Sequence, residues 1–68
     1  MASRKASAQM RALMTRYGVR YDSNRQRNLL RAIRDDFTRE TGERYTLADA
    51  ELMLDGMLEA EYQKLAAQ

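Results

Sequence analysis

Residues 23–42 read SNRQRNLLRAIRDDFTRETG, and their apolar side chains recur at the spacing of one face of an α-helix. That face consists of Leu29, Leu30, Ile33 and Phe37. Asp22 or Ser23 offers an N-terminal cap, and Gly42 follows the last turn, where a glycine commonly ends a helix. We therefore predict a helix over residues 23–41.

The sequence on both sides of this segment shows the same periodicity. Residues 4–17 end at Gly18 and carry an apolar face formed by Ala6, Met10, Leu13, Met14 and Tyr17. Residues 47–66 follow Thr46 and Asp49, which are spaced as a capping box, and carry a stripe formed by Leu47, Leu54, Leu58, Tyr62 and Leu65. The sequence thus predicts a single all-α domain over residues 1–68, a compact bundle of three helices near 4–17, 23–41 and 47–66.

The two predicted linkers resemble each other. Residues 18–21 and 42–45 share the pattern Gly-x-Arg-Tyr. This likeness reflects either a duplication or, as the preferred reading, two similar helix connections. We expect both tyrosines to pack on the helices, and an alternative pairs the two segments as a small β element.

Gly56 is unusual because it lies inside the third predicted helix. It falls opposite the leucine stripe, with Ala60 one turn away, so this helix has a second apolar side. We expect this second side to face the helix at residues 4–17 or another copy of the same helix, with Met53, Gly56, Met57 and Ala60 as the partner interface. Alternatives are a helix broken at Gly56 or a glycine without a partner. A domain this small buries only about 60% of its unfolded surface, which favours completion by a homodimer.

The formal net charge of +2 conceals two oppositely charged halves. Residues 1–34 hold nine Lys or Arg and one Asp, whereas residues 35–68 hold three Lys or Arg and nine Asp or Glu. The halves therefore carry +8 and −6. Such asymmetry favours an anionic partner for the basic half, pairing between the halves, or both.

Arginines cover two predicted helix faces of the basic half. Arg27, Arg31 and Arg34 lie nearly opposite the apolar face of 23–41, and residues 4–17 add Arg4, Lys5, Arg11 and Arg16. This concentration is typical of proteins that contact the phosphate backbone of DNA or RNA. We expect nucleic-acid contacts from six residues: Arg11, Arg16, Arg20, Arg27, Arg31 and Arg34.

Acidic residues occupy one face of the third predicted helix. Glu51, Asp55 and Glu59 are spaced at i, i+4 and i+8 and form what we call the acidic ladder. The ladder either pairs with basic helices of the same or another subunit, or stays exposed and repels nucleic acid.

The composition argues against catalysis. The sequence contains no His and no Cys, which removes the usual nucleophile–base pairs, zinc fingers and most metal sites. We therefore expect no enzyme activity, no cofactor and no bound metal. A helix-turn-helix fits poorly, because Met14 occupies the position where that motif needs a small residue before its turn glycine, Gly18.

Two functions from different classes remain. The first is a small nucleic-acid-binding regulator that uses the basic surface of the first two helices. The second is a protein–protein interaction module, an inhibitor or adaptor that docks a larger host protein through residues 47–66. We expect a cytoplasmic protein, without signal peptide or membrane span, and its short Arg-rich chain is typical of phage or mobile-element accessory proteins.

Overall fold

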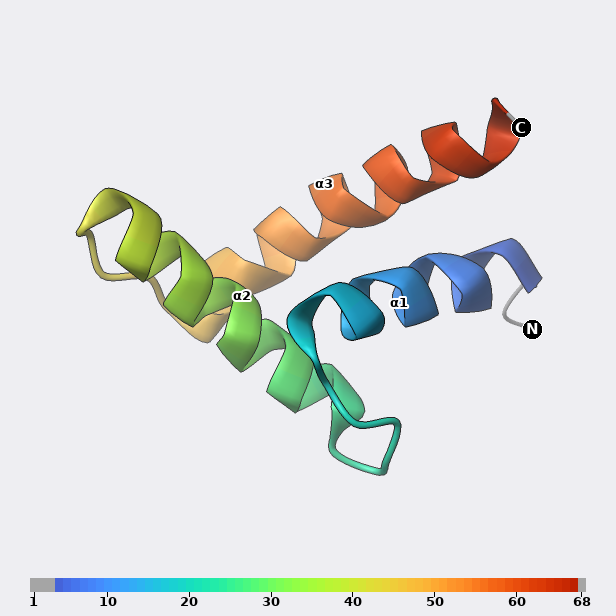
Figure 1. Cartoon of the computed structure of the whole chain (residues 1–68). Coiled ribbons are helices and arrows are strands. Elements are labelled where there is room, and N and C mark those ends of the chain that lie inside the picture. The colour runs from blue at the N-terminus through green and yellow to red at the C-terminus, as the bar shows by residue number, and fades with distance from the viewer. Residues whose placement is uncertain (1–3, 68) are drawn as a thin grey trace.

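Three helices form the structure, a computed structural model that describes residues 4–67 and the side chains from residue 8 onward (Figure 1). The helices are α1 (Arg4–Tyr17), α2 (Arg25–Thr41) and α3 (Leu47–Ala66). The predicted all-α, compact three-helix domain is confirmed, and its helix ends differ from prediction only at the start of α2. The side chains of Arg4, Lys5 and Ala6, named above, lie outside the described residues.

The helix ends follow local chemistry. Thr46 and Asp49 form the predicted capping box, in which each side chain accepts a hydrogen bond from the backbone N–H of the other residue. Helix α2 begins two residues later than predicted, because the Asp22 carboxylate accepts the Asn24 backbone N–H at 2.8 Å and extends the linker. The residue before the first turn is therefore Asn24, and the prediction of Asp22 or Ser23 as the cap was wrong.

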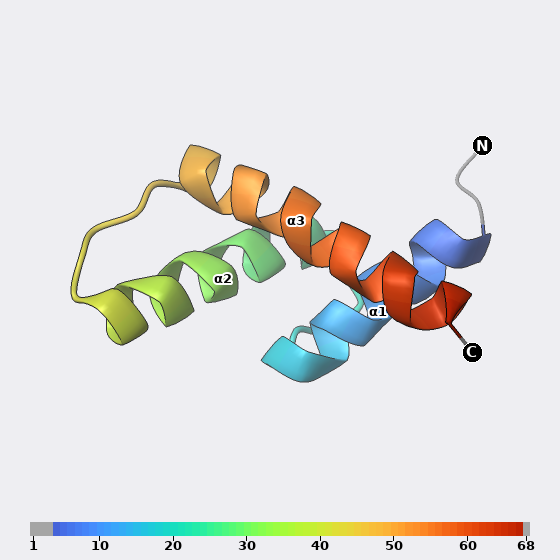
Figure 2. The ribbon, with the colours of Figure 1, turned by 90° about the horizontal axis from the view of Figure 1, so that it is seen from above.

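Helix α3 packs against both other helices. Figure 2 shows its first half passing along α2 and its second half along α1. Helices α1 and α2 contact each other less extensively than either contacts α3. The core lies where the three meet, and its buried apolar side chains are Leu13, Met14, Leu29, Leu30, Ile33, Ala50 and Leu54.

Gly56 leaves α3 uninterrupted. The helix runs from Leu47 to Ala66 through this residue, so the alternative of two separate pieces was wrong. No side chain or other backbone lies within 4 Å of the position that a Cβ atom at Gly56 would occupy. Gly56 therefore faces open space, and the helix continues because its flanking turns keep their hydrogen bonds and packing.

The two Gly-x-Arg-Tyr linkers have different structures. At the end of α1, Val19 N–H donates to Met14 and Gly18 N–H donates to Thr15, the pair of bonds that defines a Schellman motif. At the end of α2, Gly42 N–H donates to Thr38, the bond of the simpler αL motif. No strand occurs within residues 4–67, so the predicted β alternative was wrong.

Candidate nucleic-acid interface

The linker between α1 and α2 exposes an aromatic ring that two arginines contact. Tyr21 is 62% exposed. The guanidinium carbon of Arg25 lies 4.5 Å from the centre of its ring, and that of Arg11 lies 5.3 Å away. At these distances each cation is attracted by the ring quadrupole. The ring thus holds together one arginine from α1 and one from α2, and we call these three residues the linker cluster.

The expectation that both linker tyrosines pack on the helices holds for one of them. Tyr45 is half-buried and meets Phe37 edge to face, with ring centres 6.0 Å apart. Tyr21 instead points to solvent and contributes nothing to the core. The two linkers end their helices with different hydrogen bonds, so equivalent tyrosines are directed differently.

A hollow of about 350 Å³ adjoins the linker cluster. Met14 and Val19 give it an apolar floor, while Arg11, Thr15 and Tyr21 complete its lining. Val19 is itself packed against the core, which places the hollow directly on the folded body of the domain.

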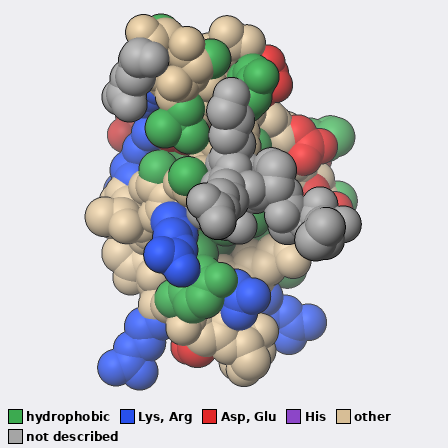
Figure 3. Space-filling view, turned by 90° about the vertical axis from the view of Figure 1, so that its right-hand side faces the viewer, with side chains coloured by type: hydrophobic (Ala, Val, Ile, Leu, Met, Phe, Trp, Pro, Cys, Tyr) green, Lys and Arg blue, Asp and Glu red, His purple; other side chains and the backbone are tan. Residues whose placement is uncertain are grey.

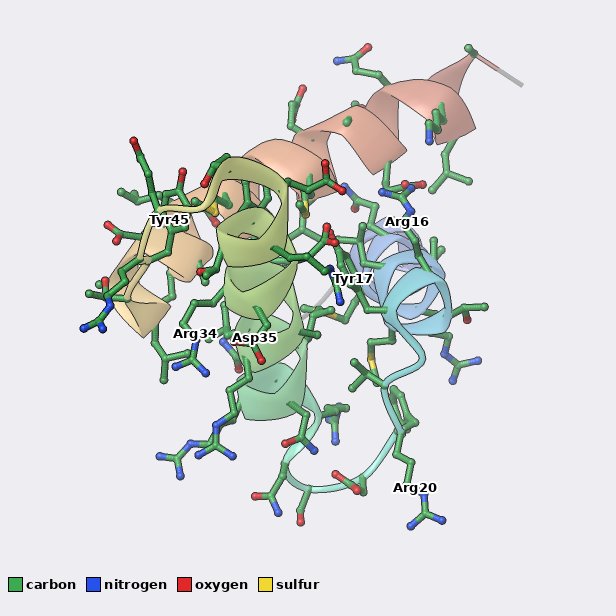
Figure 4. The ribbon with its side chains drawn as sticks, turned by 60° about the vertical axis from the view of Figure 1, so that its left-hand side comes forward. Arg16, Tyr17, Arg20, Arg34, Asp35 and Tyr45 are labelled. Atoms are coloured by element: carbon green, nitrogen blue, oxygen red, sulfur yellow. The ribbon has the colours of Figure 1, made fainter. Side chains whose placement is uncertain are left out.

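Five of the six predicted arginines lie at the linker end of the molecule, meaning the linker together with the two adjoining turns of each helix, and four of these five form no ion pair with a described acidic residue. Arg11 belongs to the linker cluster, and Arg20 projects from the linker into solvent (Figure 4). Arg27 and Arg31 are exposed on the first two turns of α2 and form no ion pair with any described acidic residue. These four cations are therefore available to an anionic ligand.

The other two predicted arginines are already paired. Arg34 donates to Asp35 at 3.1 Å, and the two side chains lie together on α2 (Figure 4). Arg16 donates to the buried Glu61 of α3. Pairing within the chain reduces what either guanidinium can offer to a phosphate.

The structure adds Tyr21 and Arg25, which the candidate set lacked. Their spacing of four residues was visible in the sequence, but residues 18–24 were not expected to form a turn that brings Arg25 over the ring. The turn depends on Asp22. Its carboxylate accepts a hydrogen bond from the Asn24 backbone N–H, and its backbone carbonyl accepts one from the Arg25 guanidinium. Asp22 is also the only acid of residues 1–34.

The first turn of α2 borders a second hollow, of about 560 Å³. It is lined by Ser23, Asn24, Gln26, Arg27, Leu30, Leu47 and Glu51. The first turn of α2 contains no acidic residue, and the Asn24 side chain makes no cap hydrogen bond. The positive end of the helix dipole thus adds to the charge of Arg27 at this edge.

Charged side chains are unevenly distributed over the face of the molecule drawn in Figure 3. Most of its Lys and Arg side chains lie in the lower part, near the linker, and Asp and Glu side chains lie toward the upper right. The acidic ladder of α3 is exposed throughout. Glu51, Asp55 and Glu59 form no ion pair with any cation whose side chain the structure describes, so the described arginines of α1 and α2 leave the ladder unpaired.

The predicted partner interface on α3 is split by the fold. Met53 and Met57 pack against the chain's own core, which removes much of their surface from any partner. Gly56 and Ala60 are exposed, and Leu52 beside them is 73% exposed. Only this narrower strip is open to solvent.

One polar group of the interior has a shifted pKa. The hydroxyl of Tyr17 donates to Asp36 at 3.5 Å across α1 and α2. Burial, reinforced by the negative charge of Asp36, raises the pKa of Tyr17 above its ordinary value. This neutral phenol belongs to the packing of the helices, and it lines neither of the two hollows.

Neither a metal site nor a membrane segment occurs among the described residues. No three His, Cys, Asp or Glu side chains in that part of the chain gather where they could hold an ion. None of its helices has the length and apolar character needed to cross a bilayer.

No protein-family model, curated protein sequence or solved structure matches this chain, so the residues of the linker end carry the functional inference alone.

Proposed function

We propose that the protein is a non-enzymatic regulator that binds nucleic acid through its linker end. The observation that carries this proposal is the gathering of five arginines there, none of them in an ion pair with a described acid: Arg11, Arg20, Arg25, Arg27 and Arg31. Like charges held close together repel one another, and an anionic ligand relieves that repulsion. Guanidinium groups bind phosphate oxygens through paired N–H donors.

The charge of the rest of the molecule supports an oriented complex. The exposed acidic ladder on α3 repels phosphates, while the linker end attracts them. A nucleic acid would therefore meet the linker end first, and the regulator would act in the cytoplasm, where it can reach DNA or RNA.

The test is binding of fluorescently labelled DNA over a salt series. We expect log K to fall linearly with log salt, because phosphate contacts release counterions. In Arg20→Gln/Arg27→Gln/Arg31→Gln the slope should be smaller by about 2 to 3, close to one for each lost contact.

A matched control removes the same charge elsewhere. The variant Arg39→Gln/Arg44→Gln/Lys64→Gln has the same net charge but keeps the linker end intact, and it should retain most of the affinity. Absence of binding at low salt, or equal loss in both triple variants, would contradict the proposal.

A second candidate function is a protein–protein interaction through α3, as a homodimer or with a host protein. The observation that favours it is Leu52, the most exposed large apolar side chain, beside Gly56 and Ala60. Sedimentation at several concentrations tests the homodimer. A monomeric parent protein, or a dimer that persists when Leu52 is replaced by Ala, would count against self-association through this strip.

A further inference from the structure

The packing of the core does not account for the position of Tyr21. Tyr17 and Tyr45 pack against other helices or rings, whereas most of the Tyr21 ring is open to solvent. Its hydroxyl makes no hydrogen bond with the described residues, and its only contacts of note are the two guanidinium groups. An exposed aromatic side chain among cations is a common platform for a nucleobase, because every base has a π face.

The hollow beside Tyr21 provides a place for such a base. Its volume of about 350 Å³ falls at the lower end of the range for pockets that hold small ligands, which is roughly 300–1,000 Å³. The floor of Met14 and Val19 suits a flat apolar face, and Thr15 offers a hydroxyl that can donate or accept at its edge. Arg11 borders the hollow and also faces the Tyr21 ring.

We propose that this hollow binds an unpaired nucleobase, so that the linker end prefers single-stranded nucleic acid over duplex. This proposal rests on the proposed function above and specifies its ligand. The base stacks on the Tyr21 ring or extends the stack from the Arg11 guanidinium, and the neighbouring phosphates lie on Arg20 and Arg25. A base inside a duplex is stacked and paired on both sides, so it cannot enter the hollow without being extruded.

The experiment compares Tyr21→Ala and Tyr21→Phe on two ligands, a single-stranded 12-mer and the duplex of the same sequence. The 12-mer carries 2-aminopurine, whose fluorescence falls when it stacks on an aromatic ring. We expect Tyr21→Ala to lose about tenfold in affinity for the single strand, in line with one stacked base. Tyr21→Phe should keep the affinity and the fluorescence change, and duplex binding should change less than twofold in either variant.

The salt dependence separates stacking from an indirect effect on the arginines. The ring carries no charge, so its removal should leave the slope of log K against log salt unchanged. If the slope falls instead, Tyr21 acts by positioning Arg11 and Arg25, and the base-binding proposal is overturned. Thr15→Gln narrows the hollow without changing the ring. It should therefore also lower the affinity for the single strand more than the affinity for the duplex. Tyr62→Ala, the same truncation at a tyrosine of α3, is the control and should change the affinity for neither ligand.

The remaining outcomes distinguish this inference from the function on which it rests. Equal losses for single strand and duplex, or unchanged 2-aminopurine fluorescence on binding, would overturn base binding and leave the phosphate-binding function standing. Failure of the intact protein to bind either ligand at low salt would overturn both. Because Tyr21 is exposed, the thermal melting of Tyr21→Ala should match that of the parent protein.

Discussion

Arg16 on α1 forms an ion pair with Glu61 on α3, and the Glu61 side chain is buried although it is charged. Lys64, one turn further along α3, lies 3.5 Å from the same carboxylate oxygen. Glu61 thus lies on the face of α3 that packs against α1, between Leu58 and Leu65 of the leucine stripe. A buried carboxylate is stable only with such partners, since an unpaired charge in the interior is expensive.

This pair predicts separable effects on stability and binding. Replacing Glu61 by Gln leaves Arg16 half-exposed and unpaired, so we expect a loss of about 1–3 kcal/mol, between the values for exposed and buried pairs. Urea unfolding of the single variants and of Arg16→Gln/Glu61→Gln in a double-mutant cycle measures the coupling. Arg16→Gln should reduce nucleic-acid affinity less than Arg20→Gln does, and the reverse order would contradict the assignment of Arg16 to the fold.

Two glycines should respond in opposite directions to replacement by Ala. Gly56→Ala should stabilise the protein by about 0.5–1 kcal/mol, because a methyl group meets open space and Ala is the better helix former. Gly42→Ala should destabilise it by about 1–2 kcal/mol, because its φ of 77° is unfavourable for any residue with a Cβ atom. Thermal unfolding of both variants checks this. Destabilisation by Gly56→Ala would indicate that another surface packs against this glycine.

The caps of α2 and α3 should differ in importance. Thr46→Ala removes a side-chain acceptor from the Asp49 backbone N–H and should cost about 1 kcal/mol. Asn24→Ala should change the free energy of unfolding by less than about 0.5 kcal/mol, because that side chain makes no cap hydrogen bond. Thr46→Ser keeps the acceptor and serves as the control. A similar loss in Asn24→Ala and Thr46→Ala would contradict the assignment of the cap.

Tyr17 should make the protein sensitive to alkaline pH. Its pKa is raised in the folded state, so the folded protein holds this proton more tightly than the unfolded chain. The resulting stability is complete below the unfolded pKa of about 10 and is lost as pH rises through the folded pKa. Urea unfolding of the parent and Tyr17→Phe between neutral and alkaline pH checks this. The parent should lose more stability than Tyr17→Phe above pH 10, and parallel curves would contradict the effect.

Periodicity was sufficient for the fold because each helix carries apolar residues at the spacing of a helical face. Leu13, Leu29 and Ile33 all stand on predicted faces, and all three are fully buried. The glycines at the ends of α1 and α2 act through backbone geometry that their residue type already implies. Even the capping box of α3 follows from the spacing of Thr46 and Asp49.

The surface was harder to predict because it depends on contacts between distant segments. Arg16 and Arg20 look alike in sequence, yet one meets Glu61, 45 residues away, and the other meets solvent. Met53 and Gly56 were assigned to one interface, although the crossing of α3 over α2 turns Met53 toward the core. The position of Tyr21 beside Arg11 and Arg25 depends on the turn at Asp22, which helical periodicity does not predict. The charge pattern predicts the basic half as the candidate surface, and tertiary contacts determine which of its arginines form no ion pair with described acids.

The arrangement of α3 across the other two helices has a consequence during synthesis. Ribosomes deliver α1 and α2 first, and these two helices contact each other less than either contacts α3. Until α3 emerges, Leu13, Leu29 and Ile33 lack the helix that completes their burial, and residues 1–41 already hold ten of the twelve cations. A nascent chain that has exposed only α1 and α2 is therefore strongly cationic, and it lacks the helix that makes most of the contacts of the fold.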